Sequence, residues 1–74
     1  MDKKQMLQAM IDTAWVNYNE LHEAEAATGY DDAMDGFERK EAEGFAMGLE
    51  EAFALIYDEP AKQNIEPDYY PEEA

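Results

Sequence analysis

The chain has 74 residues, no cysteine, and a formal net charge of −14 from 19 acidic and 5 basic residues. Without cysteine there is no disulfide and no thiolate zinc site, and the negative charge repels nucleic acid and anionic membranes. A hydrophobic fraction of 46% excludes a chain that is disordered throughout, but a single core of this size is marginal and favours self-association.

The first predicted element is a helix over residues 3–27. Asp2 and Gln5 stand three residues apart, which is the spacing of a capping box at a helix start. Gly29 is expected to take the left-handed conformation that ends the helix near Ala27. Between these two ends, apolar residues are spaced by 4, 3, 4 and 3 positions along one side of the helix, namely Leu7, Ile11, Ala14, Tyr18 and Leu21.

A second helix is predicted over residues 32–58. Asp31 or Asp32 is a suitable N-cap, and Pro60 cannot continue the hydrogen-bond ladder, so the helix should stop just before it. The apolar stripe of this segment steps by 3, 4, 3 and 4 through Ala42, Phe45, Leu49, Ala52 and Ile56.

The acidic stretch at the start of the second helix has some features of a calcium-binding loop. With Asp31 as position 1, Asp35 and Gly36 fall at the required positions 5 and 6. Position 3 is Ala33 and position 12 is Ala42, so two ligands are missing, including the bidentate glutamate. Helix capping is the favoured explanation of these acids, and a calcium-responsive switch is disfavoured.

Residues 60–74 differ in composition from the rest, with three prolines and no helical period. This pattern predicts an extended or disordered acidic tail. Tyr69 and Tyr70 are interpreted either as anchors for a partner or as side chains that fold back onto the helices.

Gly44 and Gly48 form a G-x-x-x-G pattern inside the second helix. Two glycines in a helix cost about 2 kcal/mol relative to alanine, so we expect a compensating role in close helix packing. Trp15 and Tyr18 on the first helix are the expected bulky neighbours.

The aromatic residues are more numerous than the seam of one helical hairpin can bury. We therefore predict an all-α protein, with an antiparallel hairpin over residues 1–59 that dimerises into a four-helix bundle. The candidate apolar interface residues are Trp15, Tyr18, Phe37, Phe45, Phe53, Tyr69 and Tyr70.

Acidic residues three or four positions apart on a helix stand roughly 5–6 Å from one another, a spacing similar to that of phosphates along DNA. Such a row of carboxylates can imitate a nucleic-acid backbone and bind a basic protein surface. The alternative interpretation is that these acids only keep the protein soluble. The candidate acidic surface comprises Asp31, Asp32, Asp35, Glu38, Glu41, Glu43, Glu50 and Glu51.

The sequence gives no sign of a catalytic, metal or cofactor site. His22 is the single histidine and is interpreted as a solvated or hydrogen-bonded residue at the edge of the first helix. A di-iron Glu-x-x-His motif is absent because position 19 is Asn19. We therefore expect a protein that is not an enzyme and has no cofactor.

The segment EAEGFAMGLEEAFALIYDE, residues 41–59, resembles small acidic helical orphan proteins encoded by bacteriophages, especially those of actinobacteria. The resemblance covers about a quarter of the chain and implies an accessory protein that binds and inhibits a host protein. A structural or assembly protein is the alternative. No signal peptide and no apolar run of membrane-spanning length are visible, so we expect a location in the host cytoplasm and no membrane partner.

Overall fold

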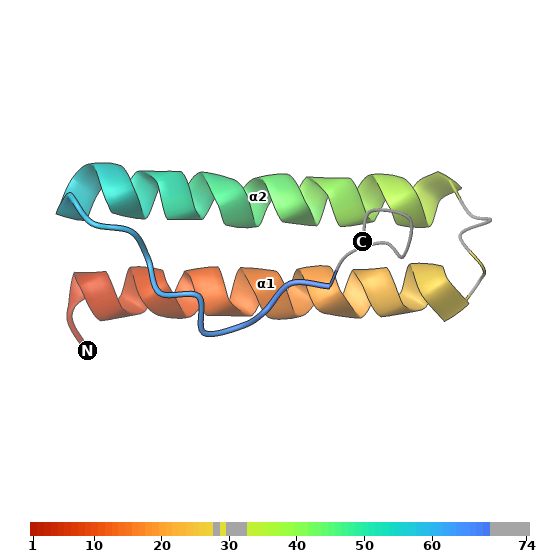
Figure 1. Cartoon of the computed structure of the whole chain (residues 1–74), viewed down its shortest axis with the longest axis horizontal. Helices are drawn as coiled ribbons and strands as arrows, with labels where there is room; N and C mark the ends of the chain where they lie inside the picture. Colours follow the sequence, from red (N-terminus) through yellow and green to blue (C-terminus); the bar gives the residue numbers. More distant parts are fainter. Residues whose placement is uncertain (28, 30–32, 69–74) are drawn as a thin grey trace.

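Two antiparallel α-helices form the framework of the computed structural model, which describes residues 1–27, 29 and 33–68. Helix α1 spans Lys3–Ala27 and helix α2 spans Ala33–Tyr57, and the two lie side by side along their whole length (Figure 1). No strand occurs among the described residues. The predicted all-α helical hairpin is confirmed.

The ends of α1 follow the local signals in the sequence. The Asp2 side chain accepts a 2.8 Å hydrogen bond from the Gln5 backbone, and the Gln5 side chain accepts one of 3.1 Å from the Asp2 backbone. This confirms the capping box. Beyond the helix, Gly29 has a φ of 69° and its N–H donates to the carbonyl of Ala26 across 3.0 Å, which confirms its left-handed conformation.

Helix α2 begins one residue later and ends one residue earlier than predicted. Asp58 follows it with a φ of 57°, in the left-handed region that glycine normally occupies at this position. The Asp58 N–H still donates to the carbonyl of Ala54 across 2.9 Å, so the last turn is closed although the residue is not glycine.

The core is a narrow seam between the two helices. On α1, the Trp15 and Tyr18 rings pack edge to face with centroids 5.4 Å apart, and α2 adds Ala42, Ala46 and Phe53 to the same cluster. Tyr18 is fully buried. The buried apolar residues described are Ile11, Ala14, Trp15, Tyr18, Ala42, Ala46 and Phe53.

At the end of the hairpin nearest the inter-helix connection, the seam contains a buried ion pair. Nε of Arg39 on α2 donates to Oε2 of Glu25 on α1 across 2.9 Å. His22 is buried one turn before Glu25 and lies beside Tyr18, with ring centroids 6.2 Å apart. His22 was expected to be either solvated or hydrogen-bonded to Glu25 or Glu23, and its burial shows that the solvated alternative is wrong.

After α2, the chain turns back and runs along α1 as an extended segment, residues 60–68, which we call the C-terminal segment (Figure 1). The Gln8 amide donates to the carbonyl of Lys62 and accepts from its N–H, both across 2.9 Å. Asn19 repeats this arrangement further along, donating to the carbonyl of Glu66 and accepting from the N–H of Asp68.

Apolar contacts add to these hydrogen bonds. Ala61 and Ile65 pack against the core seam, so the C-terminal segment is a third layer of the fold rather than a free tail. Tyr69 and Tyr70 lie outside the described residues.

Candidate functional site

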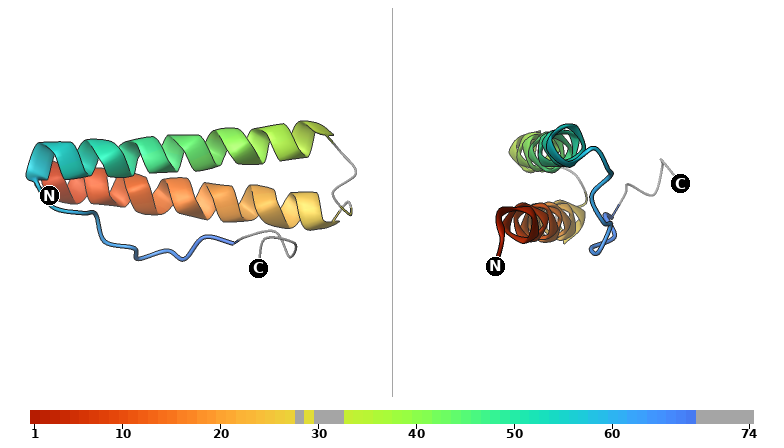
Figure 2. Two further views of the ribbon diagram at one scale, coloured as in Figure 1. Left: turned by 45° about the horizontal axis from the view of Figure 1, so that its top comes forward. Right: turned by 90° about the vertical axis from the view of Figure 1, so that its left-hand side faces the viewer.

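The two broad sides of the helical pair are different. The C-terminal segment lies on one side of the plane through α1 and α2, as the end-on view in Figure 2 shows, and the opposite side carries no third element among the described residues. We call the uncovered side the open face. Its residues include Met10, Thr13, Asn17 and Leu21 of α1 and Glu38, Glu41 and Phe45 of α2, which line hollows between the helices. Helical spacing places Lys3 and Met6 of α1, and Gly48, Ala52 and Ile56 of α2, on the same stripes.

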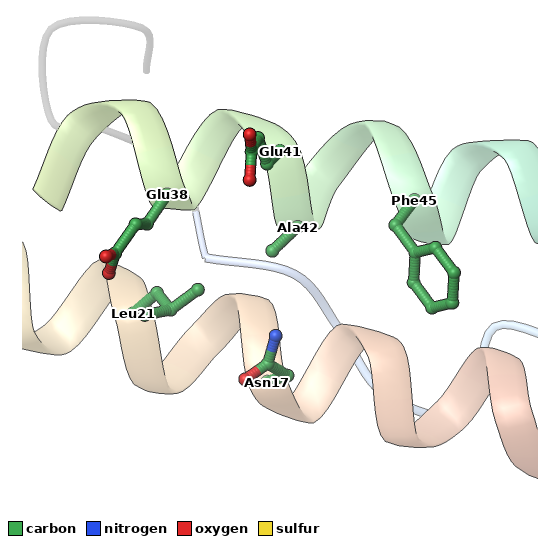
Figure 3. Close-up of a pocket in the computed structure, with 6 residues that line it drawn as sticks. All are labelled: Asn17, Leu21, Glu38, Glu41, Ala42 and Phe45. Atoms are coloured by element: carbon green, nitrogen blue, oxygen red, sulfur yellow. The ribbon is translucent and has the colours of Figure 1, made fainter. Parts of the chain in front are cut away.

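Two adjoining hollows run between the helices on the open face. Figure 3 shows one of them, with the Phe45 ring extending from α2 toward α1 and Leu21 and Asn17 opposite. The second hollow continues from Phe45 and Asn17 toward Met10 and Thr13. Phe45 is 61% exposed, so most of its surface is not covered by the rest of the chain.

The α1 side of the open face has no acidic residue. Its stripe steps by 3, 4, 3, 4 and 4 through Lys3, Met6, Met10, Thr13, Asn17 and Leu21. On α2, Glu38 and Glu41 line the hollow at the end nearest the inter-helix connection, and the stripe from Phe45 to Ile56 continues without a charge. The open face is therefore apolar and nearly neutral in a strongly acidic chain.

Acidic residues gather on the side that carries the C-terminal segment. Glu50 is five residues after Phe45, about 140° around α2, which places it on the other flank of the seam. There its Oε2 accepts a 3.0 Å hydrogen bond from Nε1 of Trp15. We call this side the acidic face. Asp12 and Glu59 line a hollow there together with Lys62. Glu66 and Asp68 belong to the segment itself, and Glu43 stands two turns before Glu50 on the same flank of α2.

Two lysines accompany these acids. Lys4 forms an ion pair with Glu59 and lies 5.6 Å from the centroid of the Tyr57 ring, and Lys62 lies in the C-terminal segment itself. Six carboxylates against two ammonium groups leave the acidic face strongly negative. The Asp12 carboxylate also accepts a hydrogen bond from Asn64, which ties the segment to α1 at its centre.

The acidic surface predicted from the sequence does not form one face. Glu38 and Glu41 line the hollow on the open face, whereas Glu50 lies on the acidic face beside Trp15. The reason is that acids at nearly every turn of α2 follow no single helical stripe. Glu43 stands two turns before Glu50 on the same flank, Glu51 is exposed on the outer side, and the side chains of Asp31, Asp32 and Asp35 lie outside the described part of the structure.

The predicted apolar interface is corrected in a similar way. Trp15, Tyr18 and Phe53 are at most 5% exposed and form the core, so they are not available to a partner. Phe45 and Phe37 are 61% and 60% exposed and remain interface candidates.

The expected packing role of Gly44 and Gly48 is wrong for the described part of the chain. Both residues are exposed, and a Cβ built on either one meets no atom within 4 Å. The close approach of the helices instead relies on buried alanines, namely Ala14, Ala42 and Ala46.

Several residues of the two faces were missed by sequence reasoning. Met6 and Met10 lie beside the apolar stripe predicted for the first helix, and the sequence pattern does not distinguish an exposed apolar face from the edge of a core. Gln8, Asp12 and Asn19 are spaced four and seven residues apart, which places them on one flank of α1, and each bonds to the C-terminal segment. That spacing of polar side chains was the available signal for a docked segment.

In the described residues, no group of three His, Cys, Asp or Glu side chains is placed to hold a metal ion. Positions 3–12 of the calcium-loop frame fall in α2, which begins at Ala33, so this backbone is helical rather than wrapped around an ion. Neither helix has an apolar stretch sufficient to cross a bilayer, within the part of the chain that could be searched.

Comparisons with protein-family models, with curated proteins and with solved structures give no match.

Proposed function

We propose that this protein is a small non-catalytic protein-binding module whose acidic face contacts a basic surface of another protein. The observation that carries the proposal is the separation of charge between the two broad sides. Six described acids stand with two lysines on the side of the C-terminal segment, and the opposite side is nearly neutral. Among the described residues, the acids of the open face are Glu38 and Glu41 at one end, and acids that served only solubility would have no reason to leave the rest of that side uncharged.

The partner class follows from the charge and the shape of the acidic face. Carboxylates on α1, on α2 and on the C-terminal segment give three rows of negative charge, and the segment is held in place by Gln8 and Asn19. A positively charged protein groove that normally holds a nucleic-acid backbone is complementary to such rows. Occupation of that groove would inhibit the partner, as expected for a phage-encoded protein acting on its host.

A second candidate function, a structural or assembly protein, is favoured by the open face. Exposed Phe45 and Met10 are typical of a surface that packs against another protein chain. In that case, the acidic face would have no partner and would act only through solvation.

The test is capture of host cytosolic proteins by immobilised protein, followed by mass spectrometry of what a salt step elutes. The wild type is compared with Glu43→Gln/Glu66→Gln, which removes two charges from the acidic face. The matched control is Glu20→Gln/Glu41→Gln, which removes two charges elsewhere, and both of its residues are exposed.

We expect the wild type and the control to retain a basic nucleic-acid-binding protein. The acidic-face variant should lose it. Retention of this protein should fall between about 50 mM and about 500 mM salt, because charge attraction is screened beyond a few ångströms at the higher concentration. Equal retention by all three proteins would overturn the proposal and favour assembly.

A further inference from the structure

We propose that the open face is the interface for a second copy of this chain, which docks with its own open face to complete a four-helix bundle. This proposal assigns a surface and an occupant that the acidic face does not involve. The two proposals can therefore be tested independently of each other.

The exposed apolar side chains are the first step of the argument. Met6 and Met10 are 52% and 51% exposed, and Phe45 and Ile56 are 61% and 64% exposed. Met10 and Phe45 line one hollow of the open face, and helical spacing puts Met6 and Ile56 on the same stripes. Burial of each side chain would stabilise the dimer by about 25 cal/mol per Å² of apolar area removed from water. The seam that the hairpin buries by itself is narrow, and small domains with such cores commonly gain stability by association.

Charge selects the occupant. A basic partner would be attracted to carboxylates, but among the described residues the acids placed on the open face are Glu38 and Glu41, both at one end. A nearly neutral apolar surface is best matched by another surface of the same kind, and a second open face meets that requirement through isologous two-fold symmetry. Two chains of charge −14 repel each other, and this contact keeps their acidic faces on opposite outer sides of the pair.

The size of the face is sufficient. The molecule measures 41 × 23 × 17 Å, and the open face is one of the two broad sides. An outline of 41 by 23 Å encloses at most roughly 900 Å², so this side can reach the about 800 Å² per partner of a stable interface when most of it is buried. The hollows between α1 and α2 give the partner side chains, Phe45 above all, a place to insert.

The proposal is tested by sedimentation equilibrium across the micromolar range, using the full chain. The wild type should sediment as a dimer with twice the 8.5 kDa mass of one chain. Phe45→Glu and Met10→Glu place a carboxylate in the proposed interface from different helices. Each should raise the dimer dissociation constant about a hundredfold, because a charge would be buried without a partner.

The matched controls are Met47→Glu on α2 and Val16→Glu on α1. These residues are 50% and 40% exposed, belong to the same helices and lie outside the open face. Their dissociation constants should stay within about threefold of the wild type. Circular dichroism of each variant verifies that the helices form. A monomeric wild type, or equal weakening by open-face and control substitutions, would overturn the proposal and leave the acidic-face function untouched.

Discussion

The guanidinium of Arg39 on α2 donates a hydrogen bond from Nε to Oε2 of Glu25 on α1 across 2.9 Å. Their side chains are only 4% and 5% exposed, so two opposite charges lie together inside the seam. Two buried charges cost much desolvation energy, which their attraction offsets only while both are present. The pair therefore fixes which residues of the two helices face each other at this end of the hairpin.

Removing one member of the pair should be much worse than removing both. Arg39→Met leaves Glu25 buried without this donor and should lower the free energy of unfolding by about 3–5 kcal/mol. The double variant Arg39→Met/Glu25→Leu should recover a large part of that loss. Urea denaturation followed by circular dichroism measures both values.

The matched control is Lys40→Met, which removes a neighbouring and exposed positive charge from the same helix. It should change stability by less than about 0.5 kcal/mol. If Arg39→Met is no more harmful than this control, the buried pair does not hold the helices together.

A substitution at the C-terminal end of α2 should raise the stability of the protein. Asp58 has a φ of 57° and a negative charge next to the negative end of the helix dipole. Asp58→Gly removes both problems and should raise stability by roughly 0.5–1 kcal/mol, while Asp58→Asn removes only the charge and should give a smaller gain. Thermal denaturation of the three proteins ranks them, and a loss of stability in Asp58→Gly would contradict the conformational argument.

The contacts of the C-terminal segment predict a local pattern of hydrogen exchange. Gln8→Ala removes the acceptor of the Lys62 amide, and Asn19→Ala removes the acceptor of the Asp68 amide. Each variant should speed exchange of its own partner amide in NMR spectra, because that backbone group then opens to water more often.

Asn17→Ala is the control for the segment, since Asn17 belongs to the same helix but lines the hollows of the opposite face. It should leave both amides unchanged. Uniformly fast exchange of the Lys62 and Asp68 amides in the wild type would mean that the segment is not held against α1 in solution.

How far the sequence predicts this molecule depends on the range of each interaction. The ends of α1 follow from short-range signals, since Asp2, Gln5 and Gly29 act on backbone groups within a few residues. The core stripe is also legible, because Ile11 and Tyr18 keep the helical period through the buried seam.

The remaining features depend on contacts between distant parts of the chain. Glu25 and Arg39 carry charges, and a hydrophobic pattern assigns charges to the surface. The C-terminal segment has no periodicity of its own and is placed by Gln8 and Asn19, more than forty residues earlier. The spacing of Gln8, Asp12 and Asn19 marks one flank of α1 as polar, but which broad side the segment covers follows only from its contacts in the folded chain.

Gly44 gives a test of the corrected glycine role. It is exposed, and a Cβ at this position meets no atom within 4 Å. Gly44→Ala should therefore raise stability by about 0.5–1 kcal/mol through better helix propensity. The comparison is Ala46→Leu, which enlarges a fully buried residue of the seam and should lower stability by about 1–3 kcal/mol. A destabilised Gly44→Ala would restore the packing role inferred from the sequence.

The acidic face should impose a cost on the free chain if it exists for recognition. Glu43 and Glu66 stand among like charges, so Glu43→Gln/Glu66→Gln should raise the free energy of unfolding slightly, by less than about 1 kcal/mol at low salt. The gain should shrink as salt rises, because screening already relieves the repulsion in the wild type. Denaturation of both proteins at low and high salt measures this difference.

Glu43→Gln/Glu66→Gln should lose the captured partner although it is more stable than the wild type. Opposite effects on binding and on stability show that these acids serve recognition and not only solubility. Residues kept for binding commonly reduce stability, whereas residues kept for folding do not. Glu20→Gln/Glu41→Gln removes an equal charge away from the acidic face and should keep the partner. If the acidic-face variant is less stable than the wild type and binds the partner equally well, these carboxylates support the fold, and the interaction must be sought on the open face.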